Sequence, residues 1–151
     1  MGDKDHVGAS LQALGVEIFF NRVNVKPGKP TTFGRRGRTL VFGLPGNPVA
    51  ALVCFHLFVM TAIRKRLGFS DPRPRRMQLS LRGEVGPSGD RPTFRPARLV
   101  TREGGLTSVE ALRWYGSGDL AACVGADGFL FQPPGGSLLD GQPVDFYPLN
   151  A

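Results

Sequence analysis

The chain has 151 residues, of which 41% are hydrophobic, and a formal net charge of +7. This length allows one ordinary domain or two small ones, and the hydrophobic content is adequate for a core. The two cysteines, Cys54 and Cys123, match neither a disulfide framework nor a metal site, and no signal peptide is visible, so we expect a reduced, cytoplasmic protein.

Basic residues gather in the middle of the chain, at Arg64, Lys65, Arg66, Arg73, Arg75, Arg76 and Arg82. The simplest interpretation is a solvated helix end and linker, because cations are favourable at a helix C-terminus. Attraction of an anionic ligand ranks second. Nucleic-acid binding ranks last, because the sequence contains no recognised binding module and no aromatic residues interleaved with the basic ones.

The first third of the chain predicts a short helix, a strand and a hairpin. Residues 5–14 form the predicted helix, which Asp5 can cap and Gly15 can end. Residues 16–25 have the composition of a strand. Residues 31–42 predict two strands folded around a basic tip.

An elbow with the sequence Gly-Leu-Pro-Gly-Asn-Pro follows at residues 43–48, between an apolar strand and an apolar helix. Proline fixes φ, glycine permits positive φ, Asn47 is a good N-cap and Pro48 falls at the first helical position. The free N–H groups of the first helical turn and the helix dipole can bind an anion there. The alternative is a stiff connection that only sets a packing angle.

The helix predicted at residues 49–67 is apolar nearly all round over its first four turns. We therefore expect both of its sides to be buried, either within the domain or against another chain. Its apolar part is short for a membrane span and contains His56.

The second half predicts short strands separated by turns. The expected strands are residues 77–85, 93–101, 106–112, 129–132 and 144–148, with a brief helix at 119–124 and a linker at 70–74 before them. Regularly spaced short strands of this kind are typical of a small barrel or sandwich.

Three motifs follow one another: Gly2-Asp3-Lys4-Asp5, then Lys26-Pro-Gly-Lys-Pro30, then the elbow. This order resembles the molybdopterin molybdenumtransferase family (bacterial MoeA and the gephyrin E domain), strongly over residues 2–68 and by pattern over 77–149. The resemblance implies an incomplete α/β half-domain of the MoaB/MogA-like molybdopterin-binding type at residues 1–70, followed by a small all-β, barrel-like domain at 77–151. It also implies that the chain is a C-terminal portion, doubtful as an enzyme by itself.

The resemblance implies catalytic roles for Asp5, Arg22 and Lys26, with Asp5 also the metal-linked carboxylate. Arg22, Asn24 and Lys26 alternate along the expected strand and would share one face, as an oxyanion site requires. The alternatives are a helix cap for Asp5 and a solvent-facing strand side for the other residues. Lys29 is expected to be structural.

The resemblance implies substrate-binding roles for Pro45, Gly46, Asn47, Pro48, Arg95 and Ser117. Arg98 is the other register for the Arg95 assignment, and an ordinary N-cap is the alternative for Ser117.

By resemblance, the protein inserts molybdenum from molybdate into adenylylated molybdopterin during molybdenum cofactor biosynthesis, with Mg²⁺ as cofactor. The expected partners are the anionic pterin substrate and either a second copy, as a homodimer, or an N-terminal part; a membrane is not expected and nucleic acid is ranked last. The alternative function is a non-catalytic scaffold or partner-binding module that retains the fold.

Overall fold

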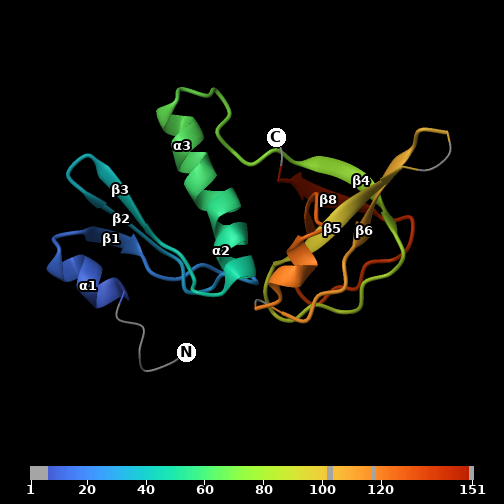
Figure 1. The fold of residues 1–151 in the computed structure, drawn as a ribbon, viewed down its shortest axis with the longest axis horizontal. Coiled ribbons are helices and arrows are strands. Elements are labelled where there is room, and N and C mark those ends of the chain that lie inside the picture. The colour runs from blue at the N-terminus through green and yellow to red at the C-terminus, as the bar shows by residue number, and fades with distance from the viewer. Residues whose placement is uncertain (1–6, 102–103, 117, 150–151) are drawn as a thin grey trace.

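The computed structural model describes residues 7–101, 104–116 and 118–149. Three parts lie side by side, as Figure 1 shows: a small sheet with a short helix, a long central helix, and a barrel. The central helix contacts the barrel through a shared hydrophobic core, so the site between them depends on both.

The sheet contains β1 (Glu17–Phe20), β2 (Thr32–Arg36) and β3 (Thr39–Gly43), preceded by α1 (Val7–Ala13). Its order is β1-β2-β3 and both pairings are antiparallel. The structure confirms the predicted hairpin at residues 31–42, and α1 confirms the predicted helix over the residues described.

Four aromatic rings pack together on this sheet. The ring of Phe33 lies 5.4 Å from Phe19, 5.6 Å from Phe20 and 4.8 Å from Phe42, measured between centroids. Phe19 nevertheless keeps half of its surface exposed. The sheet therefore presents an aromatic face that this chain covers only in part.

The strand predicted at residues 16–25 is shorter than expected, because β1 ends at Phe20. Beyond it the chain turns, with the Val23 N–H donating to the Lys29 carbonyl at 3.0 Å, and Val25 is buried away from the sheet. Arg22 and Lys26 therefore do not share a strand face, and that part of the prediction was wrong.

The central helix runs without interruption through α2 (Pro48–Cys54), a π-helical turn η1 (Phe55–Val59) and α3 (Met60–Arg66). It has 19 residues, and an 18-residue window within it has a mean hydropathy of 1.5, so length and composition alone would allow it to cross a membrane. One such helix is weak support for a membrane span, because core helices of soluble proteins have the same profile.

Only one side of this helix is buried in the chain. Val53, Cys54 and His56 are almost fully buried, whereas α3 has no buried residue and Ile63 is 41% exposed. The expected burial on both sides is therefore not met within this chain. A polar contact does hold the far end, where Arg66 Nη1 donates to the Arg38 carbonyl in the hairpin tip at 3.1 Å.

The second half is a closed five-stranded barrel, which decides between the two predicted architectures. Its strands are β4 (Met77–Arg82), β5 (Thr93–Thr101), β6 (Thr107–Ala111), β7 (Gly128–Gln132) and β8 (Pro143–Pro148), with the 3₁₀ turn η2 (Leu120–Cys123) before β7. The order around the barrel is β4-β6-β5-β7-β8, and β8 closes it by pairing with β4.

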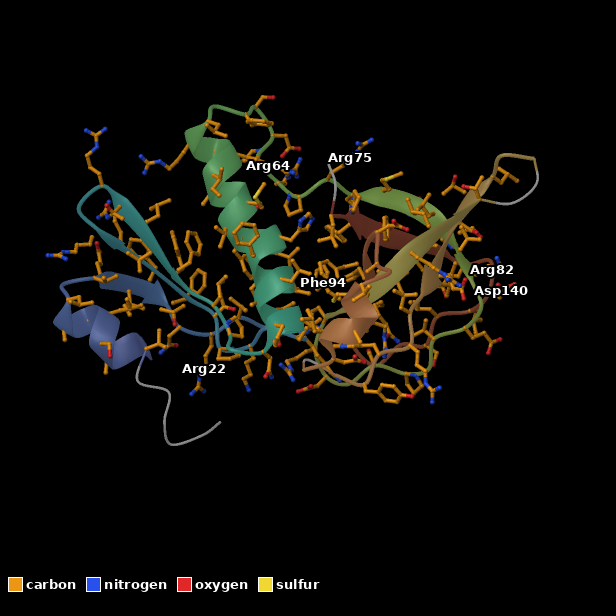
Figure 2. The ribbon with its side chains drawn as sticks, in the orientation of Figure 1. Arg22, Arg64, Arg75, Arg82, Phe94 and Asp140 are labelled. Atoms are coloured by element: carbon orange, nitrogen blue, oxygen red, sulfur yellow. The ribbon has the colours of Figure 1, made fainter. Side chains whose placement is uncertain are left out.

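Two hydrophobic clusters follow from the alternation of side chains along these strands. Leu130 of β7 points into the barrel, where it packs with residues such as Ala97 and Phe146. Its neighbour Phe129 points outward and packs with Phe94 against the central helix. Figure 2 shows Phe94 between helix and barrel. Strand β7 is therefore buried on both faces.

The Lys26 backbone joins the two halves directly. Its N–H donates to the Pro92 carbonyl at 2.8 Å, and its own carbonyl accepts from the Phe94 N–H at 2.8 Å, forming a parallel bridge to Thr93. The loop after β1 is thus fixed to the first residues of β5.

We predict that Gly28→Ala lowers the stability of the fold. Gly28 has φ +133°, and an added Cβ would collide with the Cys54 sulfur and lie 3.2 Å from Val25 Cγ1. Strain and overpacking together should cost on the order of 3 kcal/mol of unfolding free energy. Urea denaturation followed by circular dichroism measures this change in unfolding free energy. Gly46→Ala is the control, since its Cβ meets no atom within 4 Å; equal midpoints for the two variants would contradict the prediction.

We predict that stability falls as the pH drops below about 6.5, because of His56. Burial, and then the charge of Arg64, lower the pKa of His56 below its usual 6.5. The native histidine therefore stays neutral where the unfolded one takes up a proton, so its contribution is fully present above pH 6.5 and is lost as pH falls. Denaturation midpoints at pH 7.5 and 5.5 measure this.

The control variants use the two histidines of the chain. His56→Gln should flatten the pH dependence, whatever its effect at neutral pH, whereas His6→Gln should keep it. An unchanged pH dependence in His56→Gln would show that another group is responsible.

Candidate functional site

A pocket of about 370 Å³ opens where the loop after β1, the elbow and the barrel meet. It is lined by Lys26, Pro27, Gly28, Lys29, Pro30, Pro45, Gly46, Asn47, Ala50, Arg91 and Trp114. Both sequence motifs thus lie on one cavity, although the β2–β3 hairpin separates them in the chain. The barrel supplies the remaining wall.

The Lys-Pro-Gly-Lys-Pro loop is held rigidly on the inner side of this pocket. Its Lys26–Pro27 peptide is cis, and Gly28 packs against Cys54 of the central helix. Thr31 Oγ1 lies 2.7 Å from the Gly28 carbonyl and 3.0 Å from Cys54 Sγ. The hydroxyl has one proton, which it can donate either to the Gly28 carbonyl or to the Cys54 sulfur, and the Cys54 thiol donates to the Gly28 carbonyl at 3.7 Å.

Cys54 is a packing residue and not a reactive thiol. Burial raises the pKa of its thiol above the usual 9.0, and the Thr31 hydrogen bond only partly opposes this. The protonated form therefore dominates near neutral pH, which suits its place in the shared core.

The elbow forms the opposite wall. Asn47 occupies the N-cap position, with φ −75° and ψ 127°, and Pro48 is the first helical residue, as predicted. The Asn47 side chain does not accept the capping hydrogen bond. Ala50 lines the pocket from the first turn, where backbone N–H groups have no partner within the helix.

Gly46 was expected to permit a positive φ in the elbow, but its role in the structure is to leave space. It does not adopt the positive φ that only glycine tolerates well, and a Cβ at this position would meet no atom within 4 Å. The absent side chain instead leaves space in the pocket, which Gly46 lines.

Among the residues that the structure describes, three cations and no carboxylate line the pocket. Lys26 and Lys29 have no carboxylate within ion-pair distance in the part of the chain that the structure describes. Arg91 donates to the Val25 carbonyl at 3.2 Å and lies 3.7 Å from Asp90, which is almost fully exposed. The local charge is therefore positive, and Lys29 lies at the pocket, not merely in a structural turn.

Arg95 reaches the pocket only through Trp114. Its Nε donates to Gln132 Oε1 at 2.7 Å, and its guanidinium carbon lies 5.6 Å from the centre of the Trp114 ring. Burial lowers the pKa of Arg95 below its usual range, yet the guanidinium stays charged. Arg98, the other register, is exposed and pairs with Glu110 at 3.2 Å, away from the pocket.

The remaining predicted site residues are not brought to the pocket. Arg22 is exposed and does not line it; Figure 2 shows Arg22 beside the sheet. Asp5 and Ser117 lie outside the described residues. Asp119 occupies the N-cap of η2 and accepts from the Ala122 N–H at 3.3 Å.

The basic cluster at residues 64–76 lies at the other end of the central helix. A helix of this length separates its ends by about 27 Å. Arg73 pairs with Asp71 and Arg76 with Asp145, all largely exposed except Asp145. These cations are therefore remote from the pocket.

Sequence reasoning missed Arg91 and Trp114. Neither belongs to a recognisable motif, and both reach the pocket only because the barrel packs against the loop at Lys26. The single signal available was that Trp114 is the chain's one tryptophan.

Both halves match known families. Residues 1–65 match the family described as a probable molybdopterin binding domain, and residues 78–149 match the MoeA C-terminal region, domain IV. The molybdenum cofactor synthesis protein cinnamon of Drosophila melanogaster is 42% identical over 88% of this chain and 22% of its own.

Two further relatives cover nearly the whole chain. A molybdopterin molybdenumtransferase of Synechocystis is 33% identical over 97% of this chain and 35% of its own. The crystal structure of a molybdopterin biosynthesis MoeA protein from Pyrococcus horikosii superposes with a TM-score of 0.73 and 29% identity, over 95% of this chain and 34% of that one. The chain thus spans about a third or less of these relatives, and over that span it belongs to the molybdopterin molybdenumtransferase (MoeA) family.

Proposed function

We propose that this chain contributes to molybdenum insertion into molybdopterin, and that its pocket binds the anionic groups of the substrates. One observation carries the proposal: Lys26, Lys29 and Arg91 line a cavity to which the described residues contribute no carboxylate. Molybdate and a pterin phosphate are both anions, so this cavity has the charge that either requires.

The backbone adds to this charge. The central helix starts at the pocket, and its first-turn N–H groups and dipole favour an anion near Ala50. The lysines are mobile point charges, whereas Arg91 is held by the Val25 carbonyl. In this arrangement the residues bind and orient an oxyanion; none of them needs to transfer a proton.

The shape of the pocket is fixed by prolines. Pro27, Pro30 and Pro45 line it, and each has a restricted backbone. A preformed cavity loses little entropy when a ligand binds. We propose that these prolines contact the uncharged part of the adenylylated pterin.

Mg²⁺ does not fit the residues in view. Among residues 7–101, 104–116 and 118–149, no three His, Cys, Asp or Glu side chains gather to hold a metal ion. Magnesium prefers carboxylate oxygen ligands, and the described residues contribute none to the pocket lining. The binding proposed here therefore uses the cations and the backbone alone, and the metal role of Asp5 stays a prediction.

We also propose that residues 1–70 correspond to part of a MoaB/MogA-like domain and 77–151 to a barrel domain, acting in the cytoplasm. The aromatic face around Phe33 and the exposed side of α3 would then pack against a second copy or further sequence, as the relatives' greater length allows. Exposed apolar faces of this kind mark interaction surfaces. We propose that molybdenum insertion is carried out by the assembly of this chain with that second copy or further sequence.

We predict that Lys26→Ala weakens binding of molybdate and of AMP about tenfold, because it removes a charge at the centre of the pocket. Isothermal titration of the chain with each ligand measures the affinities. Lys65→Ala is the matched control, since it removes the same charge at the far end of the central helix. The difference should shrink in high salt. Equal losses of affinity in both variants would show that only the net charge of the protein matters, and would contradict the assignment of Lys26 to the anion site.

We predict that Gly46→Ala weakens AMP binding severalfold without changing stability. The new methyl group enters open space in the pocket and touches no protein atom, so it narrows the cavity at no cost to folding. Gly125→Ala serves as control, because its Cβ is equally free and it lies outside the pocket. Unchanged affinity in Gly46→Ala would show that the ligand does not occupy this wall.

A further inference from the structure

Trp114 is the only tryptophan of the chain, and it forms part of the pocket wall. It lies between β6 and η2 in the chain. Its indole N–H is buried and has no hydrogen-bond partner in the described structure. Buried donors are nearly always paired, so a simple hydrophobic plug does not account for this residue.

Arg95 contacts the Trp114 ring, and Gln132 in turn holds Arg95. Gln132 is fully buried, and its amide NH₂ donates to the carbonyls of Gly86 at 2.7 Å and Gly136 at 2.6 Å. Its amide oxygen accepts from Arg95 Nε, and the Arg95 guanidinium lies over the Trp114 ring. A cation over one face of an indole is attracted by its π-electrons. The orientation of the ring is therefore fixed before any ligand binds.

The pocket thus has two chemically different parts. Lys26, Lys29 and Arg91 supply positive charge, whereas Trp114 and the prolines supply apolar surface. An inorganic oxyanion would use only the first part. A volume of about 370 Å³ is of the size that accommodates a small organic ligand.

We propose that Trp114 is the surface on which the planar heteroaromatic ring of the substrate stacks, and that it selects a ring-bearing anion over a bare oxyanion. This inference rests on the proposed function of the pocket. Arg95 acts through Trp114 as a positioning residue and does not touch the ligand. An adenylylated pterin contains two such rings, the adenine and the pterin, and either can stack in this way.

The test uses AMP, pterin-6-carboxylate, ribose 5-phosphate and molybdate as separate ligands of the whole chain. Affinities come from calorimetry, and quenching of the single tryptophan gives an independent signal. Trp114→Leu should weaken binding of at least one ring-bearing ligand about tenfold. It should leave ribose 5-phosphate and molybdate unchanged. Trp114→Phe should recover part of the loss, because an aromatic face is restored. The ligand that loses more identifies which ring stacks.

Arg95→Gln tests the positioning role. It should weaken the same ring-bearing ligand severalfold and shift the emission of Trp114 in the free protein, whereas Arg98→Gln should do neither. Circular dichroism of each variant checks that it folds. Loss of affinity for all four ligands in Trp114→Leu would overturn the inference, since a folding defect or a general wall would explain it.

The two proposals fail differently. If Lys26→Ala weakens AMP and molybdate while Trp114→Leu changes neither ring-bearing ligand, the stacking inference is wrong and the anion site stands. If wild-type protein binds none of the four ligands, both are wrong.

Discussion

The bridge between the Lys26 backbone and the start of β5 is the contact on which the rest of the site depends. Two hydrogen bonds of 2.8 Å fix the loop to the barrel, and the shared core of Val25, Cys54 and Phe94 closes around them. Backbone bonds shielded by such a core are hard to break, because an unpaired buried amide is costly. The pocket is therefore a junction between two halves and not a property of either half.

The junction also determines which cations of the chain lie at the pocket. The chain carries many cations, but most lie in exposed ion pairs or on solvated surface, where each contributes little. Lys26 and Lys29 differ because no described carboxylate lies within ion-pair distance of them, and Arg91 differs because it is also held by the Val25 carbonyl while its partner Asp90 is almost fully exposed. Position, and not the net charge of +7, gives the site its preference for anions.

Local signals in the sequence predicted much of the fold. Proline, glycine and asparagine marked the elbow, and turn residues between short, regularly spaced runs marked the barrel strands, since these patterns act over a few residues. The strand after Phe20 was predicted too long, because its end is set by the turn at Val23 and by the burial of Val25 under a distant helix. The pairing of Lys26 with Thr93 and the arrival of Arg91 and Trp114 are long-range events that no local pattern records.

Barrel closure has a consequence for biosynthesis. Strand β8, which pairs with β4 and so closes the barrel, contains nearly the last described residues of the chain. The residues that orient the pocket wall, from Arg95 to Gln132, belong to strands that need this closure. During synthesis from the N-terminus, both recognition motifs leave the ribosome long before the barrel can form. The nascent chain therefore carries the loop and the elbow without a binding site, and the pocket comes into existence in one late step.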